Sequence, residues 1–339
     1  MCCCFQGADT RVNFVLTEMT FLRYFMPLII EGNKRGINST IFLCDPTSHQ
    51  KYTQPDKYKD TLVDLGQKHN FKIKYLDEIK NYSGITFLIE AVGFNLVHAA
   101  SDLEPFLAKK YKKIVLTYMT DFEGSYEHYI NKVDYVTFPS KSFAEHYNCL
   151  SDKNIYLGST KYDVDLNEEE IKEKYSLTNE KKALVVFPRL RDMHKINLIK
   201  LYQTLYQMGF KILVKTRGKD PVPAMLRGDY YFEDDSWYPH TTMELIKVSD
   251  IVINFSSTVI KETIMLNKPI VNFSIKPHKH LDFLYNYDFC RDLTSPNELE
   301  PAIDYLLKTD LKKEYNKAIQ EHLFPPGSSK RIIDFVCAI

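Results

Sequence analysis

The feature that most constrains the fold of this chain is the alternation of short apolar runs with amphipathic stretches along its length. Short apolar runs are typical of buried strands, and the amphipathic stretches between them are typical of helices that cover a sheet. Such β-α alternation predicts the α/β class with parallel sheets. In the first half, strands are expected at 11–17, 38–45, 71–77, 84–92, 112–119 and 133–140.

A second series of strands begins after an acidic, polar stretch at 160–182. Strands are expected at 183–189, 210–216, 230–234, 250–255 and 268–274, and helices at 195–208, 241–248, 258–267, 297–320 and 329–338. The 339 residues suit two domains of roughly 150 residues each. We therefore predict two Rossmann-like domains facing a cleft, at 1–165 and 166–320. A C-terminal helix is expected at 321–339, and it could cross back to the first domain.

Charge and hydropathy exclude several classes of protein. The 44 basic and 44 acidic residues cancel, so bulk charge does not favour nucleic acid as a partner. The sequence has no apolar run of the roughly 18 residues that a transmembrane helix needs. The first residues also lack the apolar core of a secretory signal.

Cysteine usage indicates the compartment. The seven cysteines form no C-x-x-C pair, which argues against a zinc ribbon or a disulfide framework. Free thiols in a reducing compartment are the simpler interpretation, so we expect a cytoplasmic protein, with peripheral association to a membrane left open. The Cys2-Cys3-Cys4 run could accept palmitate, although no adjacent myristoylation motif or basic patch accompanies it.

The segment at 250–273, DIVINFSSTVIKETIMLNKPIVNF, contains the most informative polar residues. Ser256, Ser257 and Thr258 follow an apolar strand at a strand-to-helix turn, where hydroxyls and free backbone N–H groups can bind an anion. Glu262 lies about one helical turn further on, where its carboxylate could accept hydrogen bonds from ribose hydroxyls. In the alternative interpretation the hydroxyls only cap the helix and Glu262 is a solvated surface residue.

This segment resembles the C-terminal half of GT-B-fold enzymes that use nucleotide-activated donors. Those enzymes share an apolar strand, a small hydroxyl-bearing loop, a helical Glu and then a (G/N)KP and a second apolar strand. The FPRLRD at 187–192 and the EDDSWYPHTTMELIKVSD at 233–250 resemble segments of CDP-glycerol glycerophosphotransferases. The PPGSSKRIIDFV at 325–336 resembles an ending that these enzymes share with UDP-GlcNAc 2-epimerases.

The resemblance covers about 183–336 and is weaker in the first half. The stretch at 133–163 resembles the linker side of the N-terminal GT-B domain. The HG motif of the CDP-glycerol transferases is absent, since TYMTDFEGSY stands in its place, and the H-x-E-A-G-x-R of the epimerases is absent too. The resemblance implies a GT-B-like fold with an acceptor-side first domain and a donor-binding second domain.

Basic residues at strand ends are candidates for the donor's phosphates. Glycine is scarce, at 12 of 339 residues, so helix N-termini and basic side chains would have to replace a glycine-rich phosphate loop. Arg189 ends the strand at 183–189, and Arg191 and His194 follow it. Lys215 lies near the end of the strand at 210–216, and Arg217 follows that strand. Ligands of open α/β sheets bind outside the carboxyl ends of strands. Solvated surface charge is the alternative for each of them.

A catalytic base is expected from the first domain, at the carboxyl ends of its strands. The candidates are Glu18, Glu90, Asp121 and Glu123, each of which could deprotonate an acceptor hydroxyl within hydrogen-bond reach. Glu18 could instead cap the following helix, Glu90 could be buried structure, and the other two could be ordinary loop residues.

We expect no cofactor and no metal. The D-x-D spacing at 163–165 occurs in metal-dependent glycosyltransferases of another fold, but here it lies in an acidic linker. The ten histidines form no H-E-x-x-H or H-x-x-x-H pattern, and His278 and His280 fall in a surface turn more readily than in a metal site.

The sequence therefore predicts a GT-B transferase that moves a sugar or polyol-phosphate from a nucleotide-activated donor to a glycan or lipid acceptor. Two alternatives stay open, a UDP-GlcNAc 2-epimerase-like enzyme and a catalytically silent nucleotide-binding relative.

Overall fold

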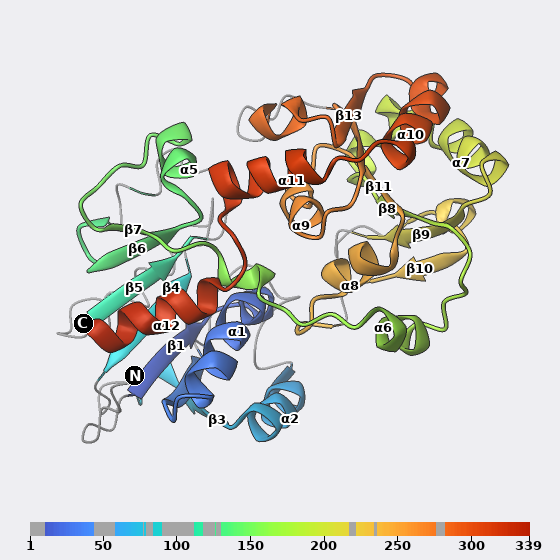
Figure 1. Cartoon of the computed structure of the whole chain (residues 1–339). Coiled ribbons are helices and arrows are strands. Elements are labelled where there is room, and N and C mark those ends of the chain that lie inside the picture. Colours follow the sequence, from blue (N-terminus) through green and yellow to red (C-terminus); the bar gives the residue numbers. More distant parts are fainter. Residues whose placement is uncertain are drawn as a thin grey trace. The chain divides into compact units, whose positions relative to one another are not determined.

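The computed structural model describes residues 11–43, 58–76, 78, 84–89, 112–117, 126, 130–216, 222–233, 236–275 and 282–339. The chain divides into two compact units. Unit 1 comprises Met1–Asp163 and Phe324–Ile339, and unit 2 comprises Val164–Leu323. Each unit is built on one parallel sheet with helices beside it (Figure 1).

Unit 1 contains a seven-stranded sheet in the order β3-β2-β1-β4-β5-β6-β7, and every neighbouring pair is parallel. Its strands are β1 (Arg11–Leu16), β2 (Asn38–Leu43), β3 (Phe71–Tyr75), β4 (Ile85–Ile89), β5 (Lys112–Leu116), β6 (Tyr135–Phe138) and β7 (Asn154–Tyr156). Its helices are η1 (Met19–Phe21), α1 (Leu22–Asn33), α2 (Lys59–His69), α5 (Lys141–His146), η4 (Thr160–Tyr162) and α12 (Ser328–Ala338).

Unit 2 contains a six-stranded parallel sheet in the order β10-β9-β8-β11-β12-β13. Its strands are β8 (Lys182–Val186), β9 (Lys211–Lys215), β10 (Tyr230–Phe232), β11 (Ile251–Asn254), β12 (Ile270–Phe273) and β13 (Cys290–Leu293). Its helices are α6 (Glu168–Lys174), η5 (Leu190–Lys195), α7 (Leu198–Gln207), η6 (Ala224–Leu226), α8 (Thr241–Val248), α9 (Ile260–Met265), η7 (Asp282–Asn286), η8 (Pro296–Glu298), α10 (Leu299–Lys308), α11 (Lys312–Ala318) and the π-helical turn η9 (Ile319–Leu323).

Both sheets follow the Rossmann strand order, in which the chain first builds outward on one side and then crosses to the other. The predicted α/β class with two Rossmann-like sheets is confirmed. Central strands such as β8 are buried at every residue, since parallel strands covered on both faces carry continuous apolar runs. Helices cover them with one apolar face, as α10 does with Leu299, Ile303 and Leu306.

Two strands and the division of one helix differ from the sequence-based expectation. The strands β7 and β13 were not expected, because β7 has only three residues and β13, with the sequence CRDL, lacks an apolar run. The single helix expected at 297–320 is divided into η8, α10 and α11. The break falls where Thr309 adopts an extended conformation and the Asp310 carboxylate accepts a hydrogen bond from the backbone of Lys312.

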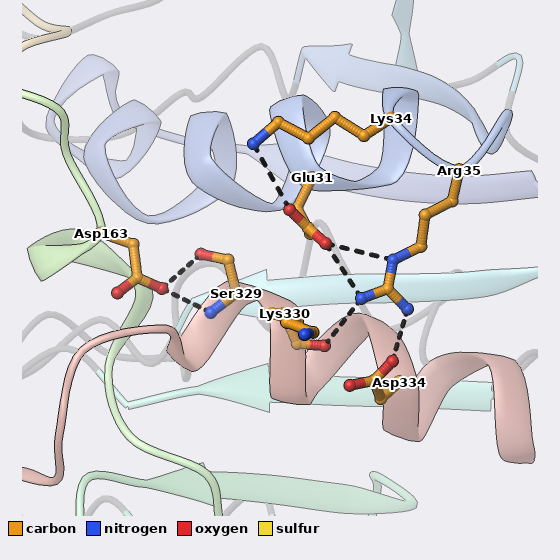
Figure 2. A network of polar contacts seen from close by, with 7 residues as sticks. All are labelled: Glu31, Lys34, Arg35, Asp163, Ser329, Lys330 and Asp334. Atoms are coloured by element: carbon orange, nitrogen blue, oxygen red, sulfur yellow. Dashed lines mark hydrogen bonds and ion pairs between the residues drawn. The ribbon is translucent and has the colours of Figure 1, made fainter. Parts of the chain in front are cut away.

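The C-terminal helix α12 packs beside α1, so the last residues of the chain complete unit 1 (Figure 1). Arg35, just after α1, donates hydrogen bonds to Glu31 at 2.9 Å and to Asp334 of α12 at 2.5 Å (Figure 2). Asp163 accepts hydrogen bonds from the backbone of Gly327 at 2.8 Å and from the hydroxyl of Ser329 at 2.7 Å. These contacts hold both ends of α12 within unit 1.

Candidate functional site

The strand order of unit 2 reverses between β8 and β11. From β8 the sheet continues through β9 to β10, and the chain then crosses to β11 on the other side of β8. Ligands of open parallel sheets bind outside the carboxyl ends of the strands at such a reversal. The segments that follow β8 and β11 therefore flank the expected binding position.

The turn at 255–258 joins β11 to α9. Phe255 anchors its start in the core, where the ring stacks on Phe273 at 5.6 Å. Ser256 has a φ of +47°, a left-handed conformation that is uncommon for a residue other than glycine. Its hydroxyl donates to the carbonyl of Phe273 at 3.4 Å, so the Ser256 side chain serves the turn itself.

The helix α9 after this turn buries two ionisable side chains. Lys261 is 5% exposed and Glu262 is 6% exposed. The interpretation of Glu262 as a solvated surface residue is therefore wrong, because the first turn of α9 faces the protein interior. A buried carboxylate needs compensating partners, so the position of Glu262 has to be accounted for by the site around it.

The segment after β8 forms η5 and exposes the side chains of Arg189, Arg191 and His194. Between them lies a residue that the sequence pattern did not single out, Asp192, which is only 6% exposed. Its carboxylate accepts a hydrogen bond from Lys195 Nζ at 2.8 Å, and its N–H donates to the carbonyl of Arg189. Asp192 thereby holds the loop on which the three exposed basic side chains stand.

Lys215 ends β9 and lies inside the protein rather than on its surface. Its side chain is 2% exposed, and Nζ donates to the carbonyl of Thr216 at 2.6 Å. Its amino group is therefore buried at the carboxyl end of β9. The other candidate of this strand, Arg217, lies outside the described residues.

The start of α8 contains buried polar residues at the carboxyl edge that the sequence analysis did not single out. This helix follows β10, so its N-terminus lies at the carboxyl edge of the sheet. Its N-cap residue, His240, is 6% exposed and is followed by buried Thr241 and Thr242. The sequence offered one indication, a polar HTT triplet directly before an apolar helical pattern.

Among the described residues, no three His, Cys, Asp or Glu side chains are grouped closely enough to hold a metal ion. His278 and His280 lie outside the described residues. Within the described part of the chain, no helix has the length and apolarity needed to cross a membrane.

No protein-family model and no curated protein sequence matches this chain. Among solved structures, UDP-GlcNAc 2-epimerase from Neisseria meningitidis bound to UDP-GlcNAc is similar with a TM-score of 0.64 and 11% identity, over 98% of this chain and 100% of that chain. The wall teichoic acid polymerase TagF, in a variant soaked with CDPG, is similar with a TM-score of 0.63 and 13% identity, over 97% of this chain and 88% of that chain. A glycosyltransferase from Rickettsia africae is similar with a TM-score of 0.55 and 14% identity, over 98% of this chain and 99% of that chain.

The chain has a GT-B-like fold. At 11–14% identity the similarity establishes the fold and leaves the reaction to be argued from the site. The GT-B resemblance of the sequence is confirmed at this level.

The first-domain candidates of this GT-B-like chain are only partly described. Glu18 follows β1 at the carboxyl edge of the first sheet and is half-buried. It occupies the N-cap position of η1 without capping it, and its carboxylate accepts a hydrogen bond from the Thr20 hydroxyl at 3.3 Å. Glu90, Asp121 and Glu123 lie outside the described residues.

The C-terminal motif of the GT-B-like chain has a structural role in unit 1. Arg331 donates to the carbonyls of Leu157, Pro325 and Pro326 at 3.2, 2.6 and 3.0 Å. Gly158 has a φ of +91°, and a Cβ there would stand 2.1 Å from the Ser328 hydroxyl. The D-x-D spacing has a structural role as well, because Asp163 binds the start of α12 (Figure 2).

Proposed function

We propose that this chain is a GT-B transferase that moves a sugar or polyol-phosphate group from a nucleotide-activated donor to a glycan or lipid acceptor. One observation carries the proposal. Buried Glu262 follows the 255–258 turn by about one helical turn, at the carboxyl edge beside the reversal of a Rossmann-order sheet. A carboxylate at that position can accept hydrogen bonds from the two hydroxyls of a ribose.

The basic residues would bind the donor's diphosphate. Arg189 and Arg191 have exposed guanidinium groups, which suit bidentate contacts to phosphate oxygens. His194 and Arg217 complete this proposed set, and buried Lys215 would contribute positive charge from below. Ser256 would shape the turn, while Ser257 and Thr258 would offer hydroxyl and N–H donors. These groups stabilise the nucleotide as negative charge develops on it during departure.

The acceptor would be deprotonated by a carboxylate of unit 1. Glu18 is the described candidate, and Glu90, Asp121 and Glu123 remain alternatives. We propose that turnover needs no divalent metal, since the leaving diphosphate would be neutralised by side chains. Loss of turnover in EDTA with recovery on adding Mn²⁺ or Mg²⁺ would contradict this part of the proposal.

A UDP-GlcNAc 2-epimerase-like reaction is the second candidate. The sequence left this alternative open, and the meningococcal epimerase shares the fold over 98% of this chain and 100% of that chain. Incubation with UDP-GlcNAc in the absence of an acceptor separates the two reactions, because only the epimerase converts GlcNAc into a ManNAc product, either still linked to UDP or free with release of UDP. Donor binding without any turnover would instead indicate a catalytically silent relative.

The deciding experiment for the donor site is a thermal-shift and calorimetric screen with UDP, CDP, GDP and CMP and their activated derivatives. A ligand at 100 times its Kd stabilises the folded state by about 2.7 kcal/mol. We expect one base to raise the melting temperature in both its nucleotide and its activated forms. The proposal is wrong if none of these compounds binds.

A further inference from the structure

Three polar side chains stand side by side across the carboxyl ends of β11, β12 and β13. Strand pairing sets Asn254 opposite Asn272 and Asn272 opposite Asp292. Asn254 Nδ2 donates to Asn272 Oδ1 at 2.9 Å, and Asn272 Nδ2 donates to Asp292 Oδ1 at 2.8 Å. We refer to these three residues as the amide ladder. Both asparagines are fully buried, whereas Asp292 is exposed.

The carboxylate at one end gives the amide ladder a direction. An ionised carboxylate accepts hydrogen bonds and donates none, so Asn272 must turn its NH2 group toward Asp292. The carbonyl oxygen of Asn272 then faces β11, where it can only meet donors. The Ser274 hydroxyl donates to Asp292 at 2.7 Å and accepts from Asn272 Nδ2 at 3.3 Å. Through both contacts, the orientation of the amides depends on Asp292.

The other end of the amide ladder holds the 255–258 turn. Asn272 Oδ1 accepts a second hydrogen bond, from the backbone N–H of Ser256 at 3.0 Å. Asn254 Nδ2 also donates to the carbonyl of Ser257 at 3.2 Å. Two successive residues of the turn are thus tied to the amide ladder, including Ser256 with its left-handed backbone.

This arrangement leaves one polar atom unsatisfied. Asn254 Oδ1 is buried and has no hydrogen-bond partner among the described residues, because both bonds of its amide are made through Nδ2. A buried carbonyl without a donor is unfavourable. The Asn254 carbonyl and the left-handed Ser256 both lie within a few residues of the proposed donor site. Proteins violate such local rules chiefly at functional positions.

We propose that Asp292 and Asn272 are positioning residues that set the 255–258 turn for a nucleotide-activated donor. This inference rests on the proposed function. Asp292 acts at a distance, through the orientation that it imposes on Asn272. If the Asn272 amide rotates, its NH2 group faces the Ser256 N–H, so two donors oppose each other and the turn loses its conformation.

The experiment reverses the direction of the hydrogen bonds within the amide ladder. Asp292→Lys places a donor opposite Asn272, so the Asn272 amide must turn its carbonyl oxygen toward position 292 and its NH2 group toward the Ser256 N–H. The double variant Asn272→Asp/Asp292→Lys moves the carboxylate to the middle position, where its oxygens can accept from position 292, from Asn254 and from the Ser256 N–H. A purely local loss of packing at position 292 would not be repaired by the substitution at position 272.

The affinity of the best-binding nucleotide from the screen is measured by calorimetry. We expect Asp292→Lys to raise its Kd about tenfold, which corresponds to about 1.4 kcal/mol, and the double variant to recover most of the loss. Hydrogen exchange at the Ser256 amide should accelerate in the single variant and slow again in the double variant.

Asp250→Ala is the matched control, since Asp250 binds the backbone of Lys182 next to the opposite end of β11. It should lower stability and leave the Kd unchanged. Asp292→Ala serves if Asp292→Lys does not fold, because Asp292 is exposed.

The results separate this inference from the function on which it rests. A wild-type chain that binds no nucleotide overturns the proposed function and the positioning role together. A wild-type chain that binds while Asp292→Lys, or Asp292→Ala in its place, binds equally well overturns the positioning role alone. Failure of the double variant to recover affinity also overturns it.

Discussion

The two ends of the unit 2 sheet use carboxylates in different ways. At the amino ends, Asp250 stands before β11 and accepts a hydrogen bond from the backbone N–H of Lys182 at 2.7 Å. Asp229 stands before β10 and does the same for Ile212 at 2.8 Å. Unit 1 contains the same arrangement, since the carboxylate of Asp134 accepts a hydrogen bond from the backbone N–H of Lys113 at 2.7 Å. Each carboxylate ties the start of its own strand to the start of a neighbour.

At the carboxyl ends, several ionisable groups are buried instead. Asp192, Lys215 and Glu262 are each 6% exposed or less. Asn254 Oδ1 of the amide ladder has no hydrogen-bond partner among the described residues. The acidic residues at the amino edge thus join neighbouring strands, whereas the buried ones at the carboxyl edge lie where we propose that the donor binds.

The substitution Glu262→Gln tests this comparison with the largest expected effect. It keeps the shape of the side chain but replaces a charged acceptor by a neutral amide. Hydrogen bonds to charged groups contribute roughly 1.5–3 kcal/mol, so nucleotide affinity should fall about ten- to a hundredfold. Calorimetric titration of UDP and CDP into both proteins measures it. Unchanged affinity for every nucleotide that binds the wild type would remove Glu262 from the site.

Arg189→Ala separates phosphate binding from base and ribose binding. Because the Arg189 side chain is exposed, the unfolding free energy should change by less than about 0.5 kcal/mol. Loss of a guanidinium–phosphate contact should weaken nucleoside diphosphate binding by about tenfold, while the affinity for the free nucleoside stays the same. Equal losses for nucleoside and nucleotide would show that Arg189 acts through the fold.

Asp250→Ala should produce the opposite pattern at the amino edge. Removing the acceptor of the Lys182 N–H is expected to cost about 1 kcal/mol of unfolding free energy. Nucleotide affinity should not change, since the residue lies at the other end of the strand. Urea denaturation and calorimetry on the same samples provide both values. A parallel fall in affinity would mean that the two edges are not independent.

The smallest effect is expected in the pH dependence of stability at the amino edge. Burial lowers the pKa of Lys268 below its ordinary 10.5, against the opposing influence of Glu168 and Asp250. Between its lowered pKa and 10.5 the unfolded chain binds more protons than the folded chain, so this group makes stability rise with pH in that window. Lys268→Met should remove that rise, as measured by denaturation at several alkaline pH values.

Lys172 supplies a control of opposite sign. Hydrogen bonds to Glu168 and Glu169 raise the pKa of Lys172 above its ordinary value. The contribution of Lys172 to the free energy of unfolding is therefore complete below pH 10.5 and is lost as the pH rises through the raised pKa. Lys172→Met should keep most of the rise assigned to Lys268, because Lys172 is the smallest of the causes that lower the Lys268 pKa. If both variants show the same slope, the burial of Lys268 does not control the pH dependence.

The sequence by itself determined the α/β class and most of the strands. Parallel strands covered on both faces must be apolar throughout, so segments such as β8 and β11 stand out in the sequence. It also indicated the turn at 256–258, because a run of hydroxyl-bearing residues between an apolar strand and a helix is typical of a helix start. Short or polar edge strands such as β13 leave no such pattern.

Only the tertiary structure decided which polar residues are buried and which of them meet. Helical spacing places Glu262 one turn after Thr258 but does not say whether that face is covered. Asn254, Asn272 and Asp292 are separated by 18 and 20 residues in the chain, and no local pattern relates them. Strand order and register bring them together, because pairing of parallel strands is set by long-range packing of the whole sheet rather than by the residues next to each asparagine.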